Sequence, residues 1–432
     1  MNLLSWGMYP KIDSKVFDFY NEEELRLIIE KYNKLIPYGN GRSYGDSAIS
    51  ENIIYMKKHN YFLDFDENRG ILHVEAGVLL SEILEYFVPR GWFLQVTPGT
   101  KLITIGGAIA SDIHGKNHHK VGCFSEYVEE FRIMLPDGEI INCTKESYPD
   151  LWKATCGGMG LTGVILDAKI KLKRINSKNI NQITIKTKNL RETFEAFEKY
   201  KDYPYSVAWI DCLAKKENIG RCLLMVGDFA DDGDLLYKEP KKLNIPFTFP
   251  SFSLNSLSVR AFNYLYYNRI KDEVTQQKVD IDTFFYPLDA IYNWNRIYGK
   301  NGFTQYQFIL PKEKSYDGLE EILMEISKSG EGSFLAVLKL YGKENENWLS
   351  FPLEGYSLAL DFKISNKVFE LLNKLDKIVL KYGGRIYLAK DVRVSKEVFE
   401  KGYPNIDKFR RFRKENGMDI KFNSLQSRRV QI

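Results

Sequence analysis

Glycine-rich segments at three places in the first half of the chain constrain its fold more than any other feature. The first, residues 37–46, directly follows a short apolar stretch that predicts a strand. Closely spaced glycines allow consecutive backbone N–H groups to converge on an anion, and Arg42 and Ser43 add a guanidinium and a hydroxyl. Two interpretations stay open from these residues alone, a phosphate-binding loop and an ordinary tight turn.

The second segment, residues 97–119, carries a run of small residues at 106–111. Small side chains would allow a flat ligand to lie against the backbone without obstruction. Because strands are predicted beside both segments, we interpret them as the two sides of one extended cofactor cleft.

The third segment, residues 158–163, matches the G-x-G-x-x-G pattern. A dinucleotide-binding fingerprint requires a strand before this pattern and a helix after it. Here a predicted helix at 150–155 precedes the pattern and a predicted strand at 163–173 follows it. We therefore reject a Rossmann-type site.

Hydrophobic periodicity predicts a mixed α+β chain. Beyond about residue 178 the predicted helices become longer and more polar, which indicates a domain boundary near that residue. Residues 231–258 lack periodicity and are expected to form a long excursion or lid. The predicted strands are 35–38, 70–76, 128–135, 140–143, 163–173, 206–212, 222–228, 304–310, 334–340 and 356–362, and the predicted helices are 22–34, 80–88, 150–155, 189–201, 318–329 and 366–382.

Composition excludes several classes of protein. With 61 Lys and Arg against 57 Asp and Glu, the net charge of +4 gives no general field for nucleic acid, and the basic run at 408–414 is interpreted as a solvated helix face. The five cysteines show no C-x-x-C spacing and are expected to be reduced and mostly buried. No run of about 18 uncharged apolar residues occurs, so a soluble or peripheral cytoplasmic protein is expected.

Three sequence motifs together resemble those of a known protein family. G-R-S-Y-G-D at 41–46, G-G-A-I-A-S-D-I-H-G-K-N-H-H at 106–119 and G-G-M-G-L-T-G at 157–163 occur in this order. They resemble the FAD-binding domain of the vanillyl-alcohol oxidase and p-cresol methylhydroxylase family, and most of all its branch of decaprenylphosphoryl-ribose oxidases. Segments 206–211, 285–289, 294–296, 305–308, 339–342 and 384–391 are also similar to that branch.

The resemblance implies an α+β, two-domain fold of the p-cresol methylhydroxylase type. Residues 1–178 would form the FAD-binding domain, and residues 179–384 a substrate domain built on an antiparallel sheet. Residues 385–432 would return to the FAD domain.

The resemblance also implies the cofactor, FAD, and the residues around it. The loop at 42–44 carries neither His nor Cys, so non-covalent FAD is expected. The implied cofactor-binding residues are Gly39, Asn40, Gly41, Arg42, Ser43, Tyr44, Gly45, Gly99, Thr100, Thr104, Gly106, Gly107, Ser111, Ile113, His114, Gly115, Val164 and Tyr387. His114, His118 and His119 have no acidic or cysteine partner at ligand spacing, so no metal site is expected.

Alcohol oxidation needs a base for the hydroxyl proton and a hydride path to the flavin. By resemblance, the catalytic residues would be Lys390, Tyr387 and Gln307, with Lys390 orienting the substrate hydroxyl or, if desolvated, accepting its proton. Gln305 and Gln307 alternate onto one face of a strand and can reach one pocket. The implied substrate-binding residues are Tyr44, Lys116, Trp209, Gln305, Gln307, Lys339, Ala359 and Lys390.

Ala359 stands where a member of the branch has a pocket-wall cysteine, which leaves oxidation possible and the sugar undecided. The implied substrate is a polyprenyl-phosphate-linked pentose, oxidised at its 2-hydroxyl to a keto sugar as the first half of an epimerisation in cell-envelope polysaccharide synthesis. A separate short-chain reductase would complete the epimerisation. Residues 259–271 mix aromatics with cations, which suits a peripheral membrane contact, and equally a core helix with solvated charges. The alternatives are a soluble sugar-alcohol or aldonolactone oxidase, and a flavin-binding scaffold without turnover.

Overall fold

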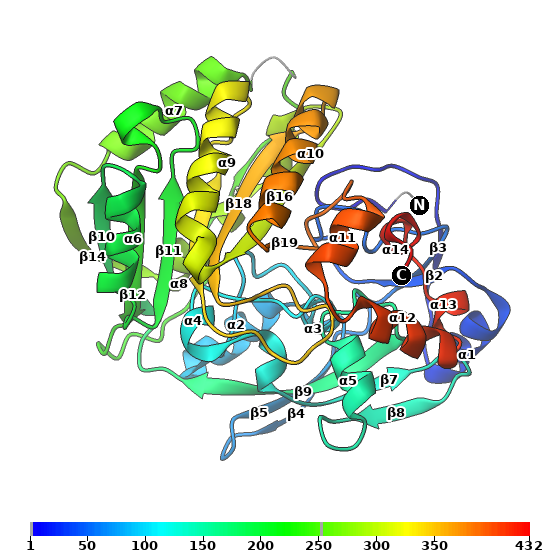
Figure 1. The fold of residues 1–432 in the computed structure, drawn as a ribbon. Helices are drawn as coiled ribbons and strands as arrows, with labels where there is room; N and C mark the ends of the chain where they lie inside the picture. The colour runs from blue at the N-terminus through cyan, green and yellow to red at the C-terminus, as the bar shows by residue number, and fades with distance from the viewer. Residues whose placement is uncertain (1–2, 251–253) are drawn as a thin grey trace.

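The computed structural model describes residues 3–250 and 254–432 and confirms an α+β fold (Figure 1). Its strands form a small parallel sheet, an N-terminal antiparallel sheet and a large antiparallel sheet. The order of helix and strand along the chain follows the sequence expectation closely, and the differences lie in short elements.

The small parallel sheet has the strand order β1-β3-β2, comprising β1 (Lys15–Phe17), β3 (Asn52–Tyr55) and β2 (Leu35–Tyr38). Helix α1 (Glu22–Lys31) precedes β2 and begins where the Asn21 side chain accepts the backbone N–H of Glu24. Leu25 and Ile29 form its buried stripe. The first glycine-rich loop leaves the carboxyl end of β2.

The N-terminal antiparallel sheet has the order β4-β5-β9-β7-β8, with β6 paired to β9. Helix α3, which the sequence left undecided between helix and turn, packs against β9. The elements of this part are β4 (Phe62–Asp66), β5 (Ile71–Glu75), β6 (Trp92–Leu94), β7 (Val128–Met134), β8 (Ile140–Cys143), β9 (Val164–Arg174), α2 (Leu80–Phe87), α3 (Ile105–Ala110), α4 (His118–Val121) and α5 (Pro149–Thr155).

The large antiparallel sheet has the order β14-β10-β12-β11-β17-β18-β16-β19. Helices α6, α9 and α10 cover one of its faces with a continuous apolar core (Figure 1). The elements are β10 (Asn179–Thr187), β11 (Tyr205–Ile210), β12 (Cys222–Phe229), β14 (Val274–Asp280), β16 (Phe303–Pro311), β17 (Ala336–Tyr341), β18 (Gly355–Lys363), β19 (Arg385–Ile386), α6 (Leu190–Lys199), α8 (Ile281–Phe285), α9 (Ser315–Ser329) and α10 (Asn366–Lys381).

The excursion expected at 231–258 carries little regular structure where it is described. Strand β13 (Leu243–Asn244) pairs in parallel with β15 (Ile291–Tyr292), and residues 251–253 lie outside the described part. Helix α7 (Ser256–Asn268) follows and buries Val259, Asn263 and Tyr267 at helical spacing.

The C-terminal helices α11 (Lys396–Gly402), α12 (Ile406–Glu415), α13 (Met418–Lys421) and α14 (Leu425–Val430) lie beside the N-terminal elements (Figure 1). Phe422 pairs with Leu35 of β2 in an isolated parallel bridge. Arg413 is 1% exposed, and its Nε donates to the Leu161 carbonyl at 3.1 Å. The solvated face expected at 408–414 is therefore wrong for Arg413, because this guanidinium caps backbone carbonyls that would otherwise be buried without donors.

The proposed domain boundaries at 178 and 384 stay a prediction. All five cysteines are free and buried, as expected. Within the described residues, no helix is both long and apolar enough to cross a bilayer.

Arg429 of α14 ties the C-terminus to the first glycine loop. Its Nη2 lies 2.8 Å from Asp46 Oδ1 and 2.9 Å from Asp391 Oδ2. Both carboxylates are buried. Burial raises the pKa of Asp391, but the charge of Arg429 and backbone N–H donors outweigh it and hold that pKa below its usual range.

We expect Arg429→Gln to lower the free energy of unfolding by about 3 kcal/mol at pH 7, because two buried carboxylates lose their counter-ion. Burial already raises the folded-state pKa of Asp46, and loss of Arg429 would raise it further, so the stability of the variant falls as pH rises and part of the loss is recovered at pH 5. Urea unfolding of both proteins at the two pH values measures this. Arg428→Gln, which breaks a more exposed pair with Glu51, is the control and should cost under about 1 kcal/mol.

Candidate active site

The two glycine-rich loops lie side by side, as the cleft interpretation requires. The Asn40 side-chain amide donates to the Leu102 carbonyl at 2.7 Å. A Cβ on Gly39 would stand 2.3 Å from Thr104 Oγ1, so a larger residue would push the loops apart. The backbone of both loops therefore borders one space.

The C-terminal segment closes onto the first loop. The Tyr44 N–H donates to the Ala389 carbonyl at 3.0 Å, and a Cβ on Gly45 would stand 1.6 Å from the Asp391 carbonyl oxygen. The Tyr387 hydroxyl donates to the Ser111 carbonyl at 3.1 Å. Residues predicted from both ends of the chain are thus in contact.

The large sheet presents a polar face to these loops because side chains alternate along its strands. Gln305 lies opposite Asp361 and Gln307 opposite Ala359, in the β16–β18 register. Lys339 of β17 lies opposite Ser357. The intervening residues of the same strands, such as Phe308, Leu338 and Leu360, belong to the apolar core beneath α9 and α10.

His114 joins the flavin-side loop to this polar face. Its Nε2 lies 3.2 Å from Gln307 Nε2, whose amide also reaches Tyr341 and Ser357 at 3.4 Å each. Burial and the nearby Lys339 lower the pKa of His114 well below its usual value, so the ring is neutral. A neutral ring that accepts from Gln307 at Nε2 carries its proton on Nδ1.

A buried carboxylate, Asp112, fixes the second loop to the substrate side. Its Oδ2 accepts from the Asn347 amide at 2.9 Å and the Ser350 hydroxyl at 2.7 Å, and its Oδ1 from the Ser125 N–H at 3.1 Å. The neighbouring Phe351 stacks on Tyr387 with ring centroids 4.7 Å apart. Asp112 therefore helps to hold His114 and Tyr387 in place.

Three lysines lie close enough together for the charge of one, Lys339, to act on the other two. Lys116, Lys339 and Lys390 are half-buried by area, with their ammonium groups withdrawn from solvent. Burial lowers the pKa of Lys339 to about 8 and, with the Lys339 charge, that of Lys116 to about 7. Burial and Lys339 also lower the pKa of Lys390, whose Nζ lies 3.7 Å from the centre of the Tyr44 ring. A concentration of buried positive charge suits an anionic ligand.

Asp361 is the carboxylate of this cluster and was not among the residues selected from sequence. It is 1% exposed and accepts from Gln305 Nε2 at 2.6 Å and from the Tyr298 hydroxyl at 3.4 Å. Burial raises the pKa of Asp361, and Gln305 and Lys390 oppose that rise. The available signal was its spacing of two residues from Ala359, which places both on one strand face.

Three predicted residues are less closely joined to the cluster. Trp209 donates its indole N–H to the Phe334 carbonyl at 3.0 Å and packs on Tyr266 of α7. The Lys116 ammonium donates to the Phe284 carbonyl, although it remains close enough to Lys339 to be affected by its charge. Val164 begins β9 and is fully buried beneath α3. The roles of all these residues stay predictions.

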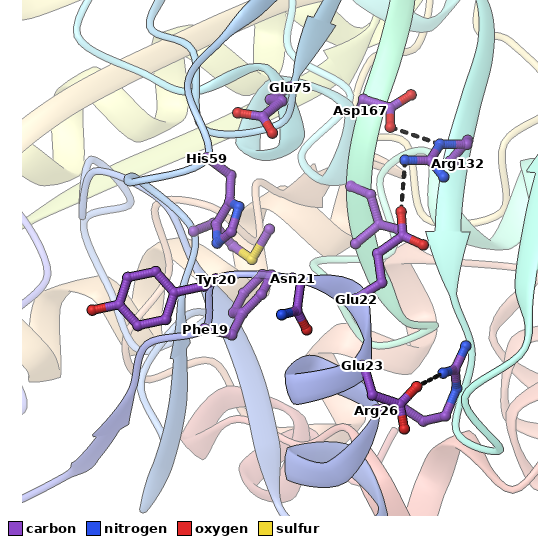
Figure 2. Close-up of a pocket in the computed structure, with 12 residues that line it drawn as sticks. Phe19, Tyr20, Asn21, Glu22, Glu23, Arg26, His59, Glu75, Arg132 and Asp167 are labelled. Atoms are coloured by element: carbon purple, nitrogen blue, oxygen red, sulfur yellow. Dashed lines mark hydrogen bonds and ion pairs between the residues drawn. The ribbon is translucent and has the colours of Figure 1, made fainter.

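A pocket of about 580 Å³ lies away from this cluster, between α1, β5, β7 and β9 (Figure 2). Arg132 bridges Glu22 at 2.9 Å and Asp167 at 2.8 Å there. Its lining contains no residue predicted for cofactor or substrate. Its charges pair with one another, and it adds nothing to the chemistry of the site.

Comparison with known proteins supports the interpretation of the loops. A family model described as an FAD binding domain matches residues 16–144. Decaprenylphosphoryl-beta-D-ribose oxidase of Mycolicibacterium smegmatis is 35% identical, with 100% of this chain and 97% of that protein covered. L-gulonolactone oxidase of Mus musculus is 29% identical over 34% of each chain, and Delta(24)-sterol reductase of Pisum sativum is 34% identical over 31% of this chain and 24% of its own.

The residues present fit FAD. A Cβ on Gly99 would meet nothing within 4 Å, so the second loop borders open space. Arg42 Nε and His114 Nδ1 are buried among the described residues without a hydrogen-bond partner. The positively charged Arg42 would suit the diphosphate of FAD, and the neutral His114 ring would suit a polar edge of the flavin.

Proposed function

Because the chain belongs to the family of FAD-linked oxidases that includes decaprenylphosphoryl-beta-D-ribose oxidase, we propose that it oxidises the 2-hydroxyl of a polyprenyl-phosphate-linked pentose to a ketone. The reaction would be the first half of an epimerisation in cell-envelope polysaccharide synthesis. Ala359, the cross-strand neighbour of Gln307 in the β16–β18 register, leaves the exact sugar and lipid carrier open.

The observation that carries this proposal is the group of three half-buried lysines. The charge of Lys339 acts on both Lys116 and Lys390, and Asp361 is the carboxylate that interacts with Lys390, so among the described residues of this cluster positive charge exceeds negative charge. A phosphate-linked substrate would supply the missing negative charge. A neutral polyol would leave it uncompensated, which disfavours the sugar-alcohol alternative.

Bound FAD would accept the hydride from the carbinol carbon. Lys390 would receive the hydroxyl proton, because burial lowers its pKa and makes its amine available as a base. Gln307, held by His114 and Tyr341, would orient the sugar. Tyr387 would border the flavin, since its hydroxyl is anchored at Ser111 O. The dry apolar contacts around Phe351 and Tyr387 would keep water away.

Non-covalent FAD is supported by the chemistry of the first loop. Residues 39–45 offer neither an imidazole nor a thiol, and His114 is engaged with Gln307. The cofactor would be retained by backbone donors, Arg42 and packing.

A separate short-chain reductase would complete the epimerisation. The glycine turn at 158–163 lies between helix α5 and strand β9, the reverse of the order that a nicotinamide dinucleotide fingerprint requires. The oxidase alone would therefore stop at the keto sugar.

A peripheral contact with an anionic membrane surface would deliver the lipid-linked substrate. On the outward side of α7, Leu257, Tyr264 and Leu265 are 76%, 61% and 69% exposed. Arg260 and Arg269 add positive charge to the same helix. The inward side of α7 covers Trp209 through Tyr266, so the contact would lie next to the site.

We expect polyprenyl-phosphoryl ribose to bleach the flavin anaerobically and to yield a keto sugar, whereas xylitol should not. Absorbance near the flavin maximum measures the bleaching, and mass spectrometry the product. Lys390→Ala should retain FAD but slow bleaching by at least about 100-fold, because the proton acceptor is lost. Bleaching by xylitol alone would favour the sugar-alcohol oxidase, and full activity of the variant would remove Lys390 from the mechanism.

Acid precipitation tests how FAD is held. We expect the yellow colour to remain in the supernatant, because the first loop offers neither an imidazole nor a thiol for a bond to the flavin. Colour that pellets with the protein would contradict this, and protein that takes up no FAD would contradict the flavoenzyme assignment.

Cosedimentation with phosphatidylglycerol vesicles tests the membrane contact. We expect the double variant Leu257→Gln, Leu265→Gln to bind several-fold more weakly than the unchanged protein, because each leucine buries apolar area in the interface. Leu27→Gln on α1, 55% exposed, is the matched control and should bind normally. Equal binding by the double variant would exclude α7 as the contact.

A further inference from the structure

Asp361 lines a second cavity, and Lys390 is not among the residues that line it. This cavity of about 370 Å³ runs beneath the start of α7. It is lined by Leu254, Asn255, Ser256, Val259, Tyr298, Ser329, Gly330, Glu331, Gly332, Phe334, Asp361, Phe362, Lys363 and Lys367. Most of these residues are polar or are glycines. Because Asn255 and Ser256 are exposed, the cavity reaches solvent and can hold several waters.

The charged groups on the cavity side are engaged with other partners. Lys363 Nζ donates to the Leu254 carbonyl at 2.8 Å, and Lys367 pairs with Glu331 at 2.8 Å. Neither cation forms an ion pair with Asp361 among the described residues. Asp361 therefore meets the cavity as a carboxylate without a counter-ion on that side.

The other titratable groups around Asp361 are Lys390 and Tyr44, which lie outside the cavity lining, and Tyr298, which is part of it. Lys390 and Tyr44 both interact electrostatically with Asp361, and Tyr298 donates to Oδ2. Gln305 holds Oδ1 at 2.6 Å and so fixes the plane of the carboxylate. The Asp361 N–H donates to Ser333 Oγ at 3.0 Å, which anchors the backbone.

Asp361 thus interacts with the buried Lys390 amine and also lines the polar cavity beneath α7. We propose that Asp361 is the outlet for the substrate's hydroxyl proton, taking it over from Lys390 and releasing it into the cavity beneath α7. This inference rests on the proposed function in needing an alcohol as substrate and Lys390 as the first acceptor of its hydroxyl proton.

The step balances as a relay. The substrate O–H bond breaks and an N–H bond forms at Lys390 Nζ, while the electron pair of the oxidised C–H bond leaves with the hydride. One N–H bond of the Lys390 ammonium then breaks and an O–H bond forms on Asp361 through an intervening water, because no direct hydrogen bond or ion pair joins the two side chains among the described residues. Finally that O–H bond breaks toward cavity water, and both groups return to their starting states.

The relay explains why an acid and a base are buried together. A lysine alone, next to Lys339, would hold an extra proton poorly and would have no route for losing it. Burial raises the pKa of Asp361, which lets a carboxyl hold a proton transiently at the pH where the Lys390 amine is available.

The first experiment compares the holoenzyme with Asp361→Asn, which keeps the shape and an acceptor for Gln305. We expect anaerobic flavin reduction to slow by about 100-fold. In the unchanged enzyme the rate should fall as the pH is lowered through two ionisations, because the Lys390 amine and the Asp361 carboxylate must both be unprotonated to accept the proton. In Asp361→Asn only the Lys390 ionisation should remain, at a lower pH, because the Asp361 charge that raises its pKa is gone. A variant that keeps the full two-step profile, whatever its rate, would overturn the proposal.

The second experiment uses Asp361→Ala, which opens the inner wall of the cavity. Added formate should enter and raise the rate of flavin reduction at least several-fold, whereas chloride at equal ionic strength should not. Absence of formate rescue in a variant that retains FAD would overturn the outlet role. If this variant does not fold, the pH profile of Asp361→Asn decides.

Asp376→Asn is the matched control. It removes another buried carboxylate, one that pairs with Arg393 and Tyr306 on the opposite face of the same sheet. It should lower stability without altering the pH profile, which separates a structural loss from a lost proton route.

A readout independent of turnover is the infrared band of a protonated carboxyl. Difference spectra of the unchanged protein across neutral pH should contain this band, and spectra of Asp361→Asn should lack it. A band that persists in Asp361→Asn would assign it to another residue and overturn the proposal. If polyprenyl-phosphoryl ribose does not bleach the unchanged enzyme, the proposed substrate fails, and the same variants are then compared with whichever alcohol does bleach it.

Discussion

The alternation of side chains across the large antiparallel sheet is the constraint on which the site depends. Along β16, β17 and β18, every second residue enters the core beneath α9 and α10, and the others face the glycine loops. A register shift by one residue would exchange Gln307 for Phe308 and destroy the core and the site together. Stability of the sheet therefore also secures the position of the polar groups.

The electrostatics of that polar face depend on what binds to it. The charge of Lys339 adds to burial in lowering the pKa of Lys116 and Lys390, and Asp361 opposes this effect at Lys390. Buried charges of one sign are costly unless a counter-charge or proton loss relieves them. In the free protein, loss of a proton from some of the lysines would lower this cost. In the complex, an anionic ligand would lower it by pairing with them.

Much of this could be predicted from sequence, for identifiable reasons. The motifs at 41–46, 106–119 and 157–163 identified the family, and long periodic elements such as α10 and β16 were found within a few residues. Helix α3 was left undecided because its Gly-Gly pair has weak helix propensity, while the Thr104 cap and packing on β9 stabilise it.

Other features required three-dimensional context. The spacing of Asp361 from Ala359 predicts its strand face, but the pairing with Gln305 is visible only in the structure. Arg413 looks in the sequence like part of a solvated basic run, but it donates to the Leu161 carbonyl, far away in the chain, and to the nearby Met418 carbonyl. In both cases the information lies in contacts between segments far apart in the chain, which periodicity cannot report.

The contact of Tyr44 with Ala389, and of Gly45 with Asp391, has a consequence for biosynthesis. The first glycine loop leaves the ribosome long before the groups that close it, which lie in the segment around Ala389 and Asp391. A nascent polypeptide therefore cannot complete the cleft until that segment has been made, and the cofactor would be captured only then. Until then the loop would depend on its own sheet or on chaperones for protection.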